Sequence, residues 1–241
     1  MEKIQNSSVS YIQTIEKRIK KIRDNPFYPY YPWAIIMKLF ITGISTDVGK
    51  TIASAIIVEA LEADYWKPIQ AGDLDNSDSH KIKSLVSNTK TKLHPNSYLL
   101  QTPASPHLAA ERDGITIDLD KIIEPQTKNH LVIEGAGGIL VPLNETDCVV
   151  DLIKKEYKVI VVSRHYLGSI NHTLLTIEAL ENRKINIAGI LFSGDENKST
   201  ESIILNKTGL KCIGRIAQEP YFDKNVIKEY ADLFRENLLN L

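Results

Sequence analysis

The chain has 241 residues and a formal net charge of −1, and 43% of its residues are hydrophobic and 24% charged. These values are typical of a globular protein with one domain and at most a short appendage. The even charge balance argues against wrapping of nucleic acid, and no apolar run reaches the roughly 18–20 residues that span a bilayer. No signal-peptide pattern opens the chain, and Cys148 and Cys212 stand far apart. We therefore expect a cytoplasmic protein with reduced thiols and without a nucleic-acid or membrane partner.

The first 36 residues differ in character from the rest. A short basic segment at 15–23 carries isoleucines at helical spacing, and a segment rich in proline and aromatic residues follows at 25–33. The basic segment could contact a membrane surface or a partner, whereas the prolines exclude a regular helix or a central strand. We expect residues 1–36 to be a peripheral extension, or to lie upstream of the true start, and residues 37–241 to form a single domain.

From Lys38 onward, predicted strands and helices alternate. Short apolar runs predict strands at 38–42, 64–69, 131–134, 159–163, 187–192 and 211–216. Helical patterns fall at 50–62, 77–86 and 170–182, with a last helix from about residue 222. Valine-, isoleucine- and leucine-rich strands separated by helices are typical of a parallel sheet covered on both faces. The predicted fold class is α/β, with a mostly parallel central sheet and helices on both faces in a Rossmann-type three-layer arrangement.

A glycine-rich loop follows the first predicted strand and leads into the first predicted helix. It reads Gly-Ile-Ser-Thr-Asp-Val-Gly-Lys-Thr over residues 43–51, with its first glycine one residue earlier than in a strict Walker A motif. The backbone N–H groups and dipole of a helix N-terminus bind phosphate, and Gly49 allows close approach. Lys50 offers charge to the β- and γ-phosphates, and Thr51 carries a hydroxyl suited to Mg²⁺. The loop predicts nucleotide binding and a P-loop NTPase-like fold.

Charged residues also stand where two later strands were predicted to end. Lys67 precedes Pro68 at the carboxyl edge of the sheet, where open α/β sheets bind ligands. Glu134 ends an apolar strand, and burying its carboxylate costs free energy unless it meets a cation. The small residues 135–137 would allow a ligand to approach the backbone, or would form a tight turn. Asp78 is also placed to cap the next helix, so its residue type alone leaves its role open.

Five segments follow the phosphate loop in the chain: Lys-Pro-Ile-Gln-Ala-Gly at 67–72, Asn-Ser-Asp at 76–78, Ser-Pro-His at 105–107, Glu-Gly-Ala-Gly-Gly at 134–138 and Leu-Gly-Ser-Ile-Asn-His at 167–172. Together with the loop, and in this order, they resemble the dethiobiotin synthetase family. The resemblance implies an ATP- and Mg²⁺-dependent cyclo-ligase of biotin biosynthesis. Such an enzyme converts 7,8-diaminononanoate and CO₂ to dethiobiotin through a carbamate and a carbamic-phosphoric anhydride.

The resemblance also implies roles for individual residues. Lys67 and Lys50 would be catalytic, Lys67 would also bind substrate, and the implied Mg²⁺ ligands are Thr51, Asp78 and Glu134. The residues implied to bind nucleotide are Thr46, Asp47, Val48, Gly49, Lys50, Thr51, Ile52, Asp78, Glu134, Gly135, Ala136 and Gly137. The family further implies a homodimer, with the segment at 168–172 near its interface and near the substrate carboxylate.

Two positions depart from the family pattern. Ala71 stands where many members have a hydroxyl residue that touches substrate, so any contact there would use the backbone. Ser193 and Gly194 stand where members often have an asparagine that reads the base. A serine hydroxyl cannot reproduce the two contacts of an amide. We therefore hypothesise that the chain also accepts nucleoside triphosphates other than ATP.

Three alternative functions fit the residues less well. A ParA/MinD-like switch ATPase typically carries an extra lysine early in the loop, where this chain has Gly-Ile-Ser-Thr at 43–46, and its membrane-targeting members end in a basic helix, whereas residues 225–241 mix both charges. A cobyrinic acid synthase needs a glutaminase domain with a nucleophilic cysteine, for which the chain is too short. A catalytically dead subunit would not be expected to retain the five charged and hydroxyl residues Lys50, Thr51, Lys67, Asp78 and Glu134.

Overall fold

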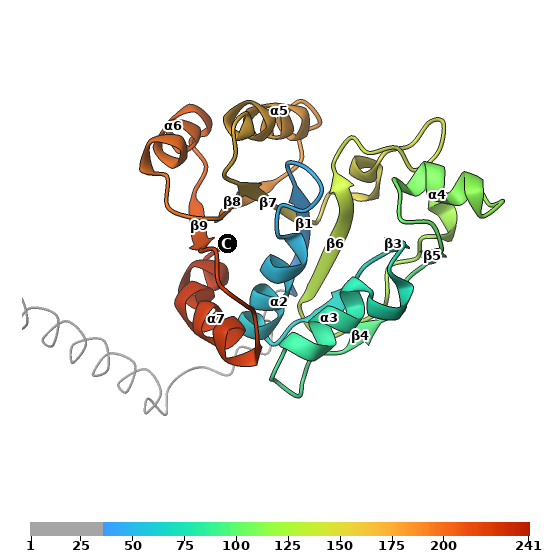
Figure 1. The fold of residues 1–241 in the computed structure, drawn as a ribbon, viewed down its shortest axis with the longest axis horizontal. Coiled ribbons are helices and arrows are strands. Elements are labelled where there is room, and N and C mark those ends of the chain that lie inside the picture. The colour runs from blue at the N-terminus through green and yellow to red at the C-terminus, as the bar shows by residue number, and fades with distance from the viewer. Residues whose placement is uncertain (1–35) are drawn as a thin grey trace, which may run out of the picture. The chain divides into compact units, whose positions relative to one another are not determined.

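A seven-stranded parallel sheet forms the centre of residues 36–241, the part of the chain that the computed structural model describes. The expectations for the N-terminal extension fall on residues 1–35, outside this part. The strand order is β4-β2-β6-β1-β7-β8-β9, and all neighbouring strands are parallel (Figure 1). The strands are β1 (Lys38–Gly43), β2 (Asp64–Trp66), β4 (Leu93–His94), β6 (Leu131–Gly138), β7 (Lys158–Arg164), β8 (Ile187–Ser193) and β9 (Cys212–Ile216).

Helices cover both faces of this sheet, which confirms the predicted α/β class. Figure 1 shows α5 and α6 on one face and α2, α3 and α7 on the other. The helices are α2 (Lys50–Leu61), α3 (Asp78–Leu85), α4 (Pro106–Arg112), α5 (Ser169–Glu181), α6 (Lys198–Thr208) and α7 (Lys224–Leu239). Within residues 36–241, no helix combines the length and apolar content that a membrane crossing requires.

The core lies between the central strands and the helices. In β1, Leu39, Phe40 and Ile41 are completely buried, as expected for a strand covered on both faces. Helix α2 is apolar around most of its circumference, and its residues from Ala53 to Leu61 are buried. A helix of this kind is stable only when it is enclosed, and α2 lies between the sheet and α7. The N-terminus of α2, and with it the phosphate loop, is therefore held on a rigid support.

The strand predicted at 64–69 is divided in two. Strand β2 ends at Trp66, and a separate strand β3 (Ile69–Ala71) pairs with β5 (Tyr98–Leu100) in a second, two-stranded sheet. Pro68 lies between them, has no N–H to donate and restricts the residue before it. Its carbonyl accepts hydrogen bonds from Ser97 and Tyr98 at 2.8 and 3.0 Å, which joins the two segments. The break releases Lys67 from both sheets.

The strand predicted to stop at Glu134 continues to Gly138. Strand β6 pairs with β1 from Leu131 to Glu134, and after an irregularity in the register the pairing ends with Gly43 beside Gly138. Glu134 therefore lies within a strand and not at its end, and the prediction of its boundary is wrong. Short elements that sequence patterns did not predict are β4, β5, α4 and α6. Helix α6 has a mostly polar sequence, and its ends are set by the Asn197 cap and by Gly209.

Candidate active site

The phosphate loop connects β1 to α2 at the carboxyl edge of the sheet. Gly49 precedes the first residue of the helix with φ 96° and ψ 22°, a left-handed conformation that favours glycine. A Cβ added there would lie 3.1 Å from the Ser193 hydroxyl, so the space is also limited. Lys50 is 7% exposed, and its Nζ donates to the Ser45 carbonyl at 3.0 Å. Burial lowers the pKa of Lys50, and the nearby Glu134 carboxylate offsets part of this effect.

A buried lysine between two carboxylates occupies the centre of the site. Lys67 is 5% exposed, and its Nζ forms an ion pair with the Asp78 carboxylate and a second one, of 3.1 Å, with Glu134 Oε1. Burial alone would lower the pKa of Lys67, but the charges of Glu134 and Asp78 outweigh it and raise the pKa above its usual value. The two carboxylates therefore favour the charged form of Lys67. In the structure the Glu134 carboxylate meets a cation in Lys67.

Three separate elements bring this cluster together. Glu134 belongs to β6, Lys67 follows the neighbouring strand β2, and Asp78 is the first residue of α3. Ser77, and not Asp78, caps α3, because its hydroxyl accepts from the backbone N–H of His80. The carboxylate of Asp78 is thereby left for Lys67, whose charge outweighs the effect of burial and holds the pKa of Asp78 below its usual range.

Hydroxyl groups complete the surroundings of Glu134. The Thr51 hydroxyl donates to Glu134 Oε1 at 2.9 Å, and the Tyr65 hydroxyl donates to Glu134 Oε2 at 3.0 Å. Glu134 is 1% exposed, so its carboxylate depends on these donors and on Lys67 in place of water. Thr51 also contacts Asp78, so the three residues implied as metal ligands lie together.

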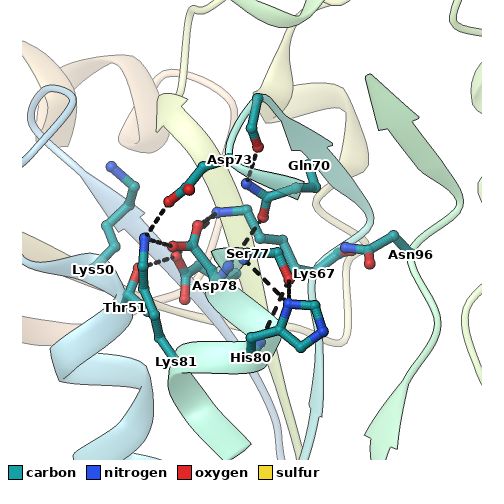
Figure 2. A network of polar contacts seen from close by, with 12 residues as sticks. Lys50, Thr51, Lys67, Gln70, Asp73, Ser77, Asp78, His80, Lys81 and Asn96 are labelled. Atoms are coloured by element: carbon teal, nitrogen blue, oxygen red, sulfur yellow. Dashed lines mark hydrogen bonds and ion pairs between the residues drawn. The ribbon is translucent and has the colours of Figure 1, made fainter. Parts of the chain in front are cut away.

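A second lysine extends the cluster towards solvent. Lys81 Nζ lies 3.0 Å from Asp73 Oδ2 and 3.6 Å from Asp78 Oδ1. Figure 2 shows Lys67 and Lys81 approaching Asp78 from different sides. Charges of opposite sign thus alternate from Asp73 at the surface to buried Glu134. Sequence reasoning missed Lys81, although its position three residues after Asp78 places both on one face of a helix.

The donor set at this cluster suits Mg²⁺. One threonine hydroxyl and two carboxylates are oxygen donors, and Mg²⁺ usually takes one or two carboxylates together with phosphate oxygens and water. Among residues 36–241 there is no group of three His, Cys, Asp or Glu side chains placed to hold a metal. Thr51, Asp78 and Glu134 would thus hold the ion only together with phosphate and water.

A cavity of about 960 Å³ opens above these side chains. It joins the phosphate loop to Lys67 and to the small residues of β6, and ten of the twelve residues implied to bind nucleotide line it: Thr46, Asp47, Gly49, Lys50, Thr51, Ile52, Asp78, Glu134, Ala136 and Gly137. Ala71 also lines it, as the family pattern implied. Gly135 does not line this cavity. It packs against the core, where an added Cβ would approach the Phe40 ring to 3.1 Å.

A smaller cavity of about 190 Å³ adjoins the other side of the phosphate loop. Val48, Ser193 and Gly194 line it together with residues 217–219, and it shares Asp47, Gly49, Ile52 and Phe222 with the larger cavity. The segment at 168–172 lines neither of these two cavities. It forms the left-handed turn at Gly168 and the start of α5, next to the fully exposed Leu167.

Comparisons with known proteins agree with this geometry. A family model described as an AAA domain matches residues 37–226. The ATP-dependent dethiobiotin synthetase of Christiangramia forsetii is 60% identical over 84% of this chain and 98% of its own length, and that of Cytophaga hutchinsonii is 50% identical over 80% and 95%. A ParA family ATPase structure from Chlorobium tepidum TLS shares the fold alone, with a TM-score of 0.52 and 12% identity over 85% of this chain and 97% of that chain. The chain therefore belongs to the ATP-dependent dethiobiotin synthetases, ATP-binding P-loop ligases of biotin biosynthesis.

Proposed function

We propose that this chain closes the ureido ring of dethiobiotin from 7,8-diaminononanoate, CO₂ and ATP, with release of ADP and phosphate. The observation that carries the proposal is the buried cation Lys67, held between Asp78 and Glu134 on the wall of a cavity that the phosphate loop also lines. A ligase of this kind must stabilise negative charge on a carboxylate-like group and on a phosphoryl group in one place. A buried cation beside a phosphate loop meets that need.

The reaction would proceed in three steps within this cavity. One amine of the substrate adds to CO₂ and loses a proton to give a carbamate. A carbamate oxygen then takes the γ-phosphoryl group of ATP, with ADP as the leaving group, to give a carbamic-phosphoric anhydride. The second amine attacks the carbonyl carbon, the bond to the phosphate oxygen breaks, and the amine proton is lost as the ring closes.

Lys67 would act as an electrostatic stabiliser in these steps. Because its pKa is raised, it keeps its proton at neutral pH, whereas a lysine that serves as a general base needs a lowered pKa. Its charge would favour the carbamate oxygens and the phosphoryl group during transfer. Lys67 therefore binds and orients the reacting group, and water or substrate takes up the released protons.

The nucleotide would span both cavities. Backbone N–H groups of the loop and the Lys50 ammonium would hold the phosphates. Thr46 also lines the larger cavity, and its hydroxyl lies 3.6 Å from where a Cβ on Gly137 would stand. Thr51, Asp78 and Glu134 would hold Mg²⁺, which when bound neutralises phosphate charge. The smaller cavity, with Ser193 and Gly194 in its wall, would take the base.

We also propose that the chain forms a homodimer through the start of α5. Leu167 is fully exposed, and the neighbouring Tyr166 and Ile170 are 39% and 36% exposed. Adjacent exposed apolar side chains are typical of protein interfaces. Light scattering should give twice the monomer mass for the native chain and the monomer mass for Leu167→Asp. A native chain that is a monomer at micromolar concentration would contradict the proposal.

The first test of the reaction is a product assay. Purified protein is incubated with 7,8-diaminononanoate, bicarbonate, MgCl₂ and ATP, and dethiobiotin is measured by mass spectrometry for the native chain, Lys67→Ala and the control Lys228→Ala. Lys228 lies on α7 in an exposed pair with Asp232, so its loss should change little. Product from the native chain and the control, with little from Lys67→Ala, is expected. Product from all three would remove Lys67 from its role, and ATP hydrolysis without product from any of them would overturn the assignment.

A further inference from the structure

Tyr65 lies directly beneath the candidate active site, but the proposed mechanism gives it no role. Its side chain is completely buried in the short central strand β2. Its hydroxyl donates to Glu134 Oε2 at 3.0 Å. A buried tyrosine hydroxyl needs a partner, and here the partner is a carboxylate that faces the cavity.

The two oxygens of Glu134 have different surroundings. Oε1 accepts from Thr51 at 2.9 Å and from Lys67 at 3.1 Å, both of which line the cavity. Oε2 accepts from Tyr65, which does not line it. A carboxylate held by donors on both oxygens cannot rotate about its terminal bond without losing a charge-assisted hydrogen bond. The contact with Tyr65 thus fixes the orientation of the carboxylate, with one oxygen turned towards the nucleotide side and the other towards the core.

The sheet makes this contact rigid. Tyr65 stands beside Val132 in the register of β2 and β6. Glu134 is two residues after Val132 and therefore points to the same face of the sheet. The tyrosine ring reaches diagonally along β6, and Lys67, two residues after Tyr65, approaches the same carboxylate. Because Tyr65 is part of the central sheet, it can hold Glu134 more firmly than a loop residue could.

We propose that Tyr65 is a positioning residue that holds Glu134 in the orientation required for Mg²⁺ and nucleotide binding. The inference rests on the proposed role of Glu134 as a Mg²⁺ ligand. Residues that hydrogen-bond to metal ligands from behind affect metal affinity or activity by about 10- to 100-fold. Loss of the Tyr65 hydroxyl should have an effect of that size on the Mg²⁺ requirement.

The test compares Tyr65→Phe with the matched control Tyr157→Phe. Tyr157 is 1% exposed and donates to Glu124 Oε2 at 2.6 Å, so it is also a buried tyrosine paired with a carboxylate, but it lines neither cavity. Calorimetry measures binding of the ATP analogue AMPPNP at a series of MgCl₂ concentrations. Tyr65→Phe should raise the half-saturating MgCl₂ concentration by about 10-fold or more, and Tyr157→Phe should leave it unchanged. Equal values for both variants would overturn the inference.

The variant Glu134→Gln distinguishes a failure of the Tyr65 inference from a failure of the proposed role of Glu134 as a Mg²⁺ ligand. If Glu134→Gln leaves the Mg²⁺ requirement of AMPPNP binding unchanged, the proposed role of Glu134 fails. If Glu134→Gln changes it and Tyr65→Phe does not, only the role of Tyr65 fails. The double variant Tyr65→Phe/Glu134→Gln tests whether Tyr65 acts through Glu134, because the effects of two residues that act as a unit do not add. Its Mg²⁺ requirement should equal that of Glu134→Gln, and a further tenfold rise would show that Tyr65 acts independently of Glu134.

Discussion

Replacement of Lys67 by methionine should destabilise the folded protein strongly. Methionine keeps most of the side-chain volume but removes the charge that lies between Asp78 and Glu134. Glu134 is 1% exposed, and the side chain of Asp78 is 17% exposed, so water cannot fully replace the lost cation. Removal of one partner from a buried ion pair costs about 3–5 kcal/mol.

Because Asp78 is partly exposed, we expect the free energy of unfolding to fall by an amount near the lower end of that range, about 3 kcal/mol. For a domain of this size each kcal/mol corresponds to about 2–4 °C in Tm, so the expected decrease is about 6–12 °C. The control is Lys228→Met, which breaks an exposed pair of 2.8 Å between Lys228 and Asp232. An exposed pair contributes under about 1 kcal/mol, and the control should melt within about 3 °C of the native chain.

Scanning calorimetry of the native chain and both variants, without ligands, measures these shifts. Addition of MgCl₂ should raise the Tm of Lys67→Met more than that of the native chain, because a divalent cation can then neutralise the two carboxylates that lost their partner. The reasoning is refuted if Lys67→Met melts within about 2 °C of Lys228→Met, since the buried charge cluster would then contribute nothing to stability.

Three further predictions concern other parts of the chain. If one hydroxyl cannot select adenine, kcat/KM for ATP should exceed that for GTP and CTP by less than about a hundredfold, and Ser193→Asn should widen the ratio; a larger native ratio would exclude relaxed base use. Gly72→Ala should lower the free energy of unfolding by about 1–3 kcal/mol or more, because Gly72 has φ +69° and a Cβ there would come within 2.4 Å of Pro103. Denaturant titration measures the change, and an unchanged midpoint would contradict this. Burial disfavours the ionised form of the Asp64 carboxylate, but the hydrogen bonds that the carboxylate accepts hold its pKa below the usual value. Its contribution to stability is therefore present at neutral pH and is lost as pH falls below about 4. The stability difference between the native chain and Asp64→Asn should shrink over that range, and a difference that stays constant to pH 3 would argue against it.

Elements that depend on local patterns could be predicted from the residues alone. The apolar run at Lys38, the glycine-rich loop and the helix after Lys50 are contiguous, so periodicity and backbone chemistry predicted the strand, the loop and the helix in the right order. Alternating strands and helices then implied a parallel sheet, since parallel neighbours need a crossover between them. Family motifs added the residues that line the larger cavity, although their roles there remain proposals.

Tertiary structure decided what each of these charged residues touches. Lys67, Asp78 and Glu134 come from three segments, and only the pairing of β2 with β6 and the docking of α3 bring them within contact of one another. In the sequence, Tyr65 is indistinguishable from any aromatic residue of a buried strand. Its hydrogen bond to Glu134 depends on the register between two strands that are distant in the chain.

The ends of β2 and β6 were predicted wrongly because they depend on pairing with strands that are distant in the chain. The predicted strand covers residues 64–69 as one element, but the chain leaves the central sheet after Trp66 and enters a second sheet with β5. Strand β6 continues through glycines that favour turns, because after an irregularity in the register it pairs with β1 again at Gly138. Pairing between distant strands supplies hydrogen bonds that no local pattern records, and it therefore overrides local preference at both places.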